Sequence, residues 1–241
     1  MIHCDKDSHC WLTLRATVPD WRSINYFQGD FNMKVRAKDF FSNAEKEKIR
    51  QAVSEAEKDT TGEIAVKVVE ASDRYRAAEM LGSVLLSGLL ALVASLLLNH
   101  ITVWFYIPVT FVLFFPCWYL FRKVPHLKLA LVSERDAMHE VSEEAIHAFY
   151  ERGLHRTKHG TGILIFISLL ERKVWILGDS GINDKVNADF WGSLVTELTK
   201  GIREGKALDA LFSVIAKCGA ELGRHFPGRH DTNVIDDDVI C

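Results

Sequence analysis

The stretch from Trp175 to Lys185, WILGDSGINDK, contains the residues that most suggest catalysis. Gly178-Asp179-Ser180-Gly181 are the four letters that surround the nucleophilic serine of chymotrypsin-like proteases. Such a serine needs an all-β, two-barrel chain that brings a histidine and an aspartate to it. A nucleophile elbow needs glycine two places after the serine, where this chain has Ile182. The sequence therefore predicts that Ser180 is a turn residue.

The acidic residues on either side of Ser180 suggest a different chemistry. Asp179 and Asp184 lie where a predicted strand leads into a predicted helix, and α/β domains usually place ligands in loops at the ends of their sheets. Glu63 opens another predicted strand and adds a carboxylate if that end of the sheet is shared. Oxygen ligands suit a hard divalent cation such as Ca²⁺ or Mg²⁺. We expect these three residues to form a metal site; the alternative is that Asn183 or Asp184 caps the following helix and the glycines make the turn.

The other candidate ligand sets in the sequence give weaker support for a binding site. The terminal segment HCDKDSHC could supply four zinc ligands, His3, Cys4, His9 and Cys10, but no apolar scaffold surrounds them. His155 and His159 stand among glycines, so we expect solvated loop histidines. The five cysteines have no regular spacing, which argues against a disulfide framework and fits a reducing compartment. No phosphate-cradling or dinucleotide-binding glycine motif is present.

The composition and the ends of the chain narrow the interpretation further. With 29 basic and 32 acidic side chains, the protein has no electrostatic footprint for nucleic acid. Residues 1–32 lack the apolar core of a secretory signal, and Met33 begins a stretch that looks like a natural start. We expect 1–32 to be a spurious or variable extension. The polar tail from about Gly228 is expected to be disordered.

A charge-free segment from Met80 to Phe121 dominates the hydropathy pattern. Leu81–Leu98 would form a helix about 27 Å long, close to the hydrocarbon thickness of a bilayer. A second apolar run, Ile101–Phe121, follows a short polar break at Asn99-His100, with tryptophan and tyrosine near its two ends. Two buried helices of a soluble core are the alternative, but such helices rarely run so far without a charge. The pattern predicts a transmembrane helical hairpin.

The flanks of the hairpin predict its orientation and its contacts. Basic residues stand on both outer sides and none at the tip: Arg74, Arg76, Arg122, Lys123 and Lys128. By the positive-inside rule the protein is expected in the inner membrane with its soluble part on the cytoplasmic side. Small residues recur every four positions in the first helix, at Ser83, Ser87, Ala91 and Ser95. This ridge would let the second helix, or another copy of the protein, approach closely.

Helices and strands alternate in the rest of the chain. Ser42 and Glu45 have the capping-box pattern before a helix that extends to about Lys58, and strands are expected from Glu63 to Glu70, in TGILIFISL and in KVWILGD. Three further amphipathic helices follow the hairpin, and Cys218 falls near the apolar face of the last. A helical crossover implies that the first two strands are parallel, and a short turn makes the third antiparallel. The prediction is an α/β layered domain on a small mixed sheet, in two parts, 41–79 and 122–227, separated by the hairpin at 80–121, with 1–40 and 228–241 as poorly structured ends.

Three stretches together resemble the TPM domain family: TGEIAVKVVE, then HRTKHGTGILIFISLLERKVWILGDSGINDKV, then REGKALDALFSVIAKCGAELGRHFP. The resemblance covers about Phe41 to Pro227 without the membrane segment. It implies an α/β/α sandwich and, in some members, an acidic cleft that binds divalent cations beside the loop after the third strand. Carried over by position, this points to Asp179 and Asp184, and to Glu63. The chain departs from the family's pattern because a hairpin interrupts the domain and because GDSGIND replaces the usual GYG and Leu-Glu.

The sequence leaves three functions open. The first is a membrane-anchored binding or auxiliary module for membrane protein complexes, with another membrane protein or a second copy as partner. The second is a metal-dependent phosphatase that uses the carboxylates of loop 178–185. The third makes the hairpin itself an oligomerisation device. The first is our leading hypothesis.

Overall fold

The computed structural model describes residues 37–72, 75–98, 102–124, 127, 130–157 and 159–228. The predictions for the N-terminal histidines and cysteines, for residues 1–32, for the hairpin tip and for the tail beyond Gly228 lie outside the described residues. The chain divides into two compact units, one of residues 1–70 with 142–241 and one of residues 71–141. We refer to them as the soluble unit and the hairpin unit.

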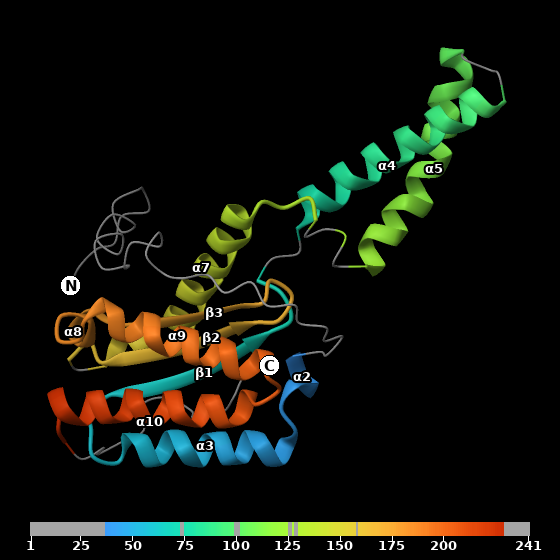
Figure 1. Cartoon of the computed structure of the whole chain (residues 1–241). Helices are drawn as coiled ribbons and strands as arrows, with labels where there is room; N and C mark the ends of the chain where they lie inside the picture. Colours follow the sequence, from blue (N-terminus) through green and yellow to red (C-terminus); the bar gives the residue numbers. More distant parts are fainter. Residues whose placement is uncertain are drawn as a thin grey trace. The chain divides into compact units, whose positions relative to one another are not determined.

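The soluble unit is built on a three-stranded mixed sheet (Figure 1). β1 (Glu63–Val69) pairs in parallel with β2 (Gly162–Ser168), and β2 pairs antiparallel with β3 (Lys173–Gly178). All seven residues of the central strand β2 are buried, as its unbroken apolar sequence predicts. The predicted directions of all three strands are therefore confirmed.

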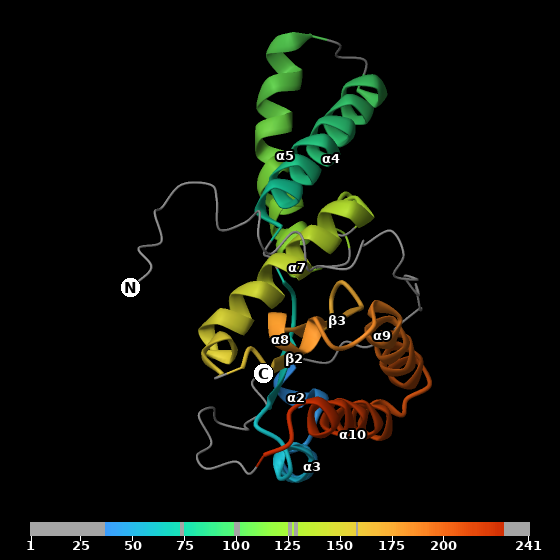
Figure 2. The same ribbon diagram turned by 90° about the vertical axis from the view of Figure 1, so that its left-hand side faces the viewer.

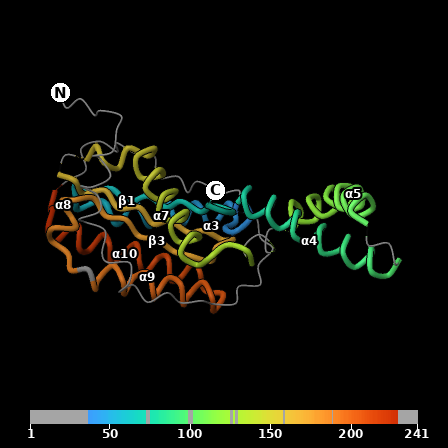
Figure 3. Tube along the Cα trace, turned by 90° about the horizontal axis from the view of Figure 1, so that it is seen from above, coloured from blue at the N-terminus to red at the C-terminus, as the bar shows by residue number. Residues whose placement is uncertain are grey.

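Three helices cover one face of the sheet: α3 (Asn43–Glu57), α9 (Ala188–Arg203) and α10 (Ala207–His225). Alternate residues of β1, such as Ile64 and Val66, join the core on this side. α10 packs against both α3 and α9, and the tube view shows α9 and α10 running beside each other (Figure 3). A short helix, α2 (Ala37–Phe40), precedes α3.

The other face of the sheet is covered by α7 (Glu134–Glu151), which lies across the strands (Figure 2). Lys67, on this face of β1, places its ammonium nitrogen 3.5 Å from a carboxylate oxygen of Glu144 and 3.3 Å from one of Glu151. Ala145 and Ala148 of α7 are fully buried. Helices on both faces of one sheet make an α/β/α sandwich, which confirms the expected fold class.

Several helices begin or end at capping residues that can be recognised in the sequence. Ser42 and Glu45 form the complete capping box: the Glu45 amide donates to Ser42 Oγ, and the Ser42 amide donates to the Glu45 carboxylate at 2.8 Å. These hydrogen bonds lower the pKa of Glu45. Gly153 after α7 and Gly205 after α9 have φ of 73° and 75°, a backbone conformation that glycine adopts without strain.

Cys218 is a core residue, as its position on α10 predicts. Its side chain is fully buried, and burial raises the pKa of the thiol to about 12. A thiol of such high pKa carries almost no thiolate near neutral pH. Cys218 is therefore a packing residue with no reactive character.

The hairpin unit contains α4 (Arg76–Leu97) and α5 (Val103–Lys123), two helices long and apolar enough to cross a membrane. They pack against each other, and the small-residue ridge of α4 is buried: Ser83, Ser87, Ala91 and Ser95. Pro108 and Pro116 lie inside α5, where a helix interior normally excludes proline. The ridge thus serves the contact between the two helices of the hairpin, one of the two partners the sequence allowed.

Candidate functional site

Two of the predicted acidic residues, Glu63 and Asp179, lie at the same end of the sheet. Glu63 stands opposite Gly162 in the register of β1 and β2. On the other side of Gly162, its carbonyl oxygen accepts a hydrogen bond of 2.9 Å from the amide of Asp179. Because neighbouring strands lie about 4.8 Å apart, the backbones of Glu63 and Asp179 are about 10 Å apart. The two residues therefore share an end of the sheet although 116 positions separate them in the chain (179 − 63).

Asp179 and Asp184 hold the two ends of a one-turn helix, α8 (Ser180–Asn183). Oδ1 of Asp179 accepts a hydrogen bond of 2.7 Å from the Ser180 amide, which makes Asp179 the N-cap. Asp184 is the C-cap and is exposed. One oxygen of the Asp179 carboxylate is thus engaged by the backbone, and Ser180 opens a helical turn beside it.

Gly181, the second glycine of the GDSG sequence, allows two backbone segments to approach closely. A methyl group on Gly181 would lie 1.9 Å from the carbonyl oxygen of His159, inside any van der Waals limit. The next amide, that of Ile182, donates to the carbonyl of Gly160 at 3.1 Å. Gly160 itself has φ of 63°. The motif therefore docks α8 against the loop before β2, and His155 and His159 in that region are exposed.

The third amphipathic helix is capped differently from the expectation. Neither Asn183 nor Asp184 caps α9, because α8 and a further turn intervene. Asn187 is its N-cap and accepts from the Asp189 amide. Asn183 instead donates from Nδ2 to the carbonyl of Gly178 at 2.7 Å. The signal that sequence reasoning missed is the Asn-Ala-Asp start at Asn187, a standard N-cap pattern with an acidic first turn.

The side chains at this end of the sheet limit whether a metal ion can bind there. Within the described ranges, no three His, Cys, Asp or Glu side chains lie close enough together to hold a metal ion. Glu63 is buried and Asp184 is exposed, so the two carboxylates face different surroundings. The described side chains do not form a complete ligand set for a metal ion. A Ca²⁺ or Mg²⁺ site at Asp179, Asp184 and Glu63 stays a prediction.

Substituting Asp179 by asparagine tests that prediction. Asparagine is as good an N-cap as aspartate, so α8 keeps its cap while the site loses one charge. If the cation site exists, calorimetric titration with Ca²⁺ or Mg²⁺ gives binding to the wild type that weakens at least about tenfold in Asp179→Asn. Asp209→Asn, in the first turn of α10, is the charge-matched control and leaves the titration unchanged. A wild-type chain that takes up neither ion contradicts the site.

Comparison with known proteins agrees with this architecture. The TPM domain family model matches residues 125–221. Among solved structures, the NMR structure of the BA42 protein from the psychrophilic bacterium Bizionia argentinensis has 20% sequence identity and a TM-score of 0.53, over 85% of this chain and 97% of that one. At that identity the likeness concerns the fold alone. No curated protein matches the chain.

The matched segment contains α7, β2, β3, α9 and most of α10, and the structure completes its sandwich with α3 and β1 from before the hairpin. Over residues 125–221 this protein is therefore similar to the TPM domain family.

Proposed function

We propose that this protein is an inner-membrane protein whose α4–α5 hairpin holds a TPM domain at the cytoplasmic surface, where the domain serves membrane protein complexes as a binding or auxiliary module. The observation that carries the proposal is the outward apolar surface of the hairpin. The hairpin unit interrupts the soluble unit between Glu70 and Ser142, so the two units are covalently joined at two points. A domain joined in this way cannot leave the membrane while the hairpin stays inserted.

The side chains of the hairpin are distributed as a bilayer requires. Large apolar residues point outward along both helices; Leu97 is 82% exposed, Trp104 89% and Phe111 65%. A soluble monomer rarely exposes a continuous apolar patch of more than a few hundred Å². The same surface is favourable in hydrocarbon, where burial of apolar area is worth roughly 25 cal/mol per Å². The exposed face of the hairpin is therefore expected to be covered by lipid.

Polar side chains of the hairpin form hydrogen bonds with backbone carbonyls of the same hairpin, as polar groups in lipid must. Ser83 Oγ donates to the carbonyl of Glu79 at 2.6 Å, and Ser95 Oγ donates to the carbonyl of Ala91 at 2.8 Å. The Tyr106 hydroxyl reaches from α5 to the carbonyl of Gly88 on α4 at 3.3 Å. These bonds leave the inner face of the hairpin suited to helix packing in a bilayer.

The ends of the hairpin carry the groups that favour the membrane interface. The guanidinium carbon of Arg122 lies 5.5 Å from the Trp118 ring centre, and the Lys123 ammonium lies 5.6 Å from that of Tyr119. Aromatic rings beside basic residues are typical of a cytoplasmic membrane boundary. Arg76 begins α4, so both outer ends of the hairpin are basic. This distribution supports a cytoplasmic soluble unit.

Alkaline carbonate extraction of membranes that contain the full chain tests the anchor. We expect the protein to stay in the membrane pellet, because carbonate strips peripheral proteins but does not extract spanning helices. Release into the supernatant contradicts the proposal. Affinity capture of the full chain from mild detergent, after crosslinking in intact membranes, then tests the auxiliary role. A membrane protein or a second copy that is captured repeatedly supports it, and a chain that is always captured alone contradicts it.

A further inference from the structure

In the described part of the chain, β3 forms one edge of the sheet, because the strand order is β1-β2-β3. The hydrogen bond from the Asp179 amide to the Gly162 carbonyl shows which backbone groups of β3 face β2. In an antiparallel pair the N–H and C=O groups of successive residues alternate between the partner strand and the opposite side. The residues whose backbone groups face the free edge are therefore the even-numbered ones: Val174, Ile176 and Gly178.

The backbone groups of this edge are largely unpaired. Among the described residues, one hydrogen bond reaches them: Asn183 donates from Nδ2 to the carbonyl of Gly178 at 2.7 Å. A carbonyl has two lone pairs, so Gly178 can accept a second bond. The edge-facing groups of Val174 and Ile176 have no hydrogen-bond partner among the described residues. Such a row of N–H and C=O groups is a template for another strand.

β3 also lacks the features by which proteins protect an exposed edge. Between Lys173 and Gly178 it has four consecutive apolar residues without a proline or a charge, and its continuous register with β2 leaves no bulge. The other edge strand, β1, is protected. The Ile64 amide donates to the buried carboxylate of Glu57 at 2.5 Å, and Lys67 places a charge within the strand. β3 is therefore the edge that favours addition of a strand.

A second copy of β3 fits this edge in one antiparallel register. A two-fold axis at Ile176 places Ile176 opposite its own copy and Val174 opposite Gly178 of the partner subunit, so all three edge-facing residues pair. Shifting the register by two residues in either direction leaves one of the three without a strand residue opposite it. The same axis places Lys173 directly opposite Asp179 of the partner subunit, and symmetry repeats this pair.

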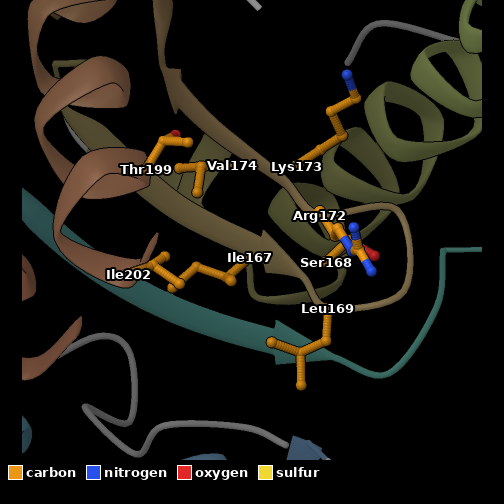
Figure 4. Close-up of a pocket in the computed structure, with 8 residues that line it drawn as sticks. All are labelled: Ile167, Ser168, Leu169, Arg172, Lys173, Val174, Thr199 and Ile202. Carbon is orange, nitrogen blue, oxygen red and sulfur yellow. The ribbon is translucent and has the colours of Figure 1, made fainter. Parts of the chain in front are cut away.

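The charges at the two ends of β3 are thus complementary between copies. Oδ1 of Asp179 accepts from the Ser180 amide, and Oδ2 has no hydrogen-bond partner among the described residues. Figure 4 shows the Lys173 side chain extended away from the strand. An ammonium group has three N–H donors, so Lys173 can keep the interaction it has within its own chain. Opposite charges that face each other across two strands are stabilising, whereas like charges are destabilising.

We propose that the soluble unit forms a two-fold symmetric dimer through β3, which joins two three-stranded sheets into one sheet of six strands (2 × 3). Both copies use the same surface, so the contact closes on itself and leaves β3 with no free edge. The inference goes beyond the proposed anchor, because it concerns the soluble unit and holds whether or not the hairpin enters a membrane.

Ile176→Pro in the full chain tests the centre of the contact. Proline is tolerated in an edge strand where the N–H faces away from the sheet, and here it removes the amide that donates across the axis. Symmetry doubles the loss to two hydrogen bonds, so we expect the dimer dissociation constant to rise about 30-fold or more. Ile176→Ala shortens the side chain but keeps the amide, and it is expected to stay within about fivefold of the wild type. Analytical ultracentrifugation in a density-matched mild detergent is the measurement.

Charge exchange tests the register without a proline. Lys173→Glu places a carboxylate opposite Asp179 of the partner subunit, and Asp179→Lys places an ammonium group opposite Lys173 of the partner subunit. Each variant alone is expected to dimerise about tenfold more weakly than the wild type. An equimolar mixture of the two is expected to recover dimers, because each chain then meets the opposite charge at both ends of β3. The loss of the Asp179 cap is the same in both samples and does not explain such a recovery.

Four results overturn the β3 dimer. The first is a wild-type chain that stays monomeric throughout the titration. The second is an Ile176→Pro chain that dimerises like the wild type, since the contact then lies elsewhere, as in the hairpin. The third is an equal loss in Ile176→Ala and Ile176→Pro. The fourth is a charge-variant mixture that dimerises no better than its components, and this result decides if Ile176→Pro does not fold. Carbonate extraction measures the anchor independently, so failure of the dimer is distinguishable from failure of the proposed function.

Discussion

Gly181→Ala is expected to destabilise the soluble unit by about 2–3 kcal/mol, the cost of forcing an added group into a packed site. The new methyl group would lie 1.9 Å from the His159 carbonyl oxygen, and a methyl on the same residue would also lie 2.8 Å from the carbonyl oxygen of Gly160. Both obstacles are backbone atoms, so no side-chain rotation relieves them. The loop must move away, which breaks the hydrogen bond from Ile182 to Gly160. Chemical denaturation of the full chain in detergent measures the change.

Gly192→Ala is the matched control for this substitution. Gly192 lies inside α9, and nothing stands within 4 Å of the position its methyl group would take. Alanine there is expected to stabilise by about 0.5–1 kcal/mol, since glycine in a helix interior loses more conformational entropy on folding. Opposite signs for two Gly→Ala changes in one unit support the docking role of Gly181. Equal or favourable effects at both positions contradict it.

Val112→Arg is expected to prevent insertion of the hairpin in a large fraction of molecules. Val112 lies at the middle of α5 and is 67% exposed, so its side chain faces the surroundings of the hairpin. An arginine at the centre of a membrane helix costs about 2.5–3.5 kcal/mol on insertion scales. In water the same change at an exposed position would be nearly neutral. The carbonate-resistant fraction of the full chain is the measurement.

Val112→Leu keeps the apolar character of the position and is expected to behave as the wild type does. The comparison separates a membrane hairpin from two surface helices of a soluble protein. Val112→Arg chains that remain as carbonate-resistant as Val112→Leu chains would contradict a lipid-facing position. Aggregation of newly made Val112→Arg protein agrees with failed insertion, because the remaining apolar surface then meets water.

The features that sequence predicted well are those set by neighbours along the chain. The capping box at Ser42 and the buried run of β2 both depend on residues that are close together in the chain. The short helix α8 was missed because a single turn shows no periodicity. Its start depends on the Asp179 cap, and the four-residue shift it introduces moved the cap of α9 to Asn187.

For the candidate sites, the sequence supplied the residue types and the structure supplied the neighbours. The acidic residues near the predicted strand ends indicate Asp179 and Glu63 as ligands, but only the strand register shows that the two lie at the same end of the sheet. Such pairings arise between segments far apart in the chain, and hydropathy patterns carry no information about them.

The sequence by itself determined that this protein has an apolar hairpin inserted in an α/β domain, because hydropathy and helix length are properties of continuous segments. Tertiary structure decided what the GDSG sequence does. Gly181 admits the backbone of the loop before β2, Asp179 caps a helical turn, and Ser180 opens that turn. The physical reason is that close backbone contact depends on the three-dimensional path of two segments, and four letters of one segment do not specify that path.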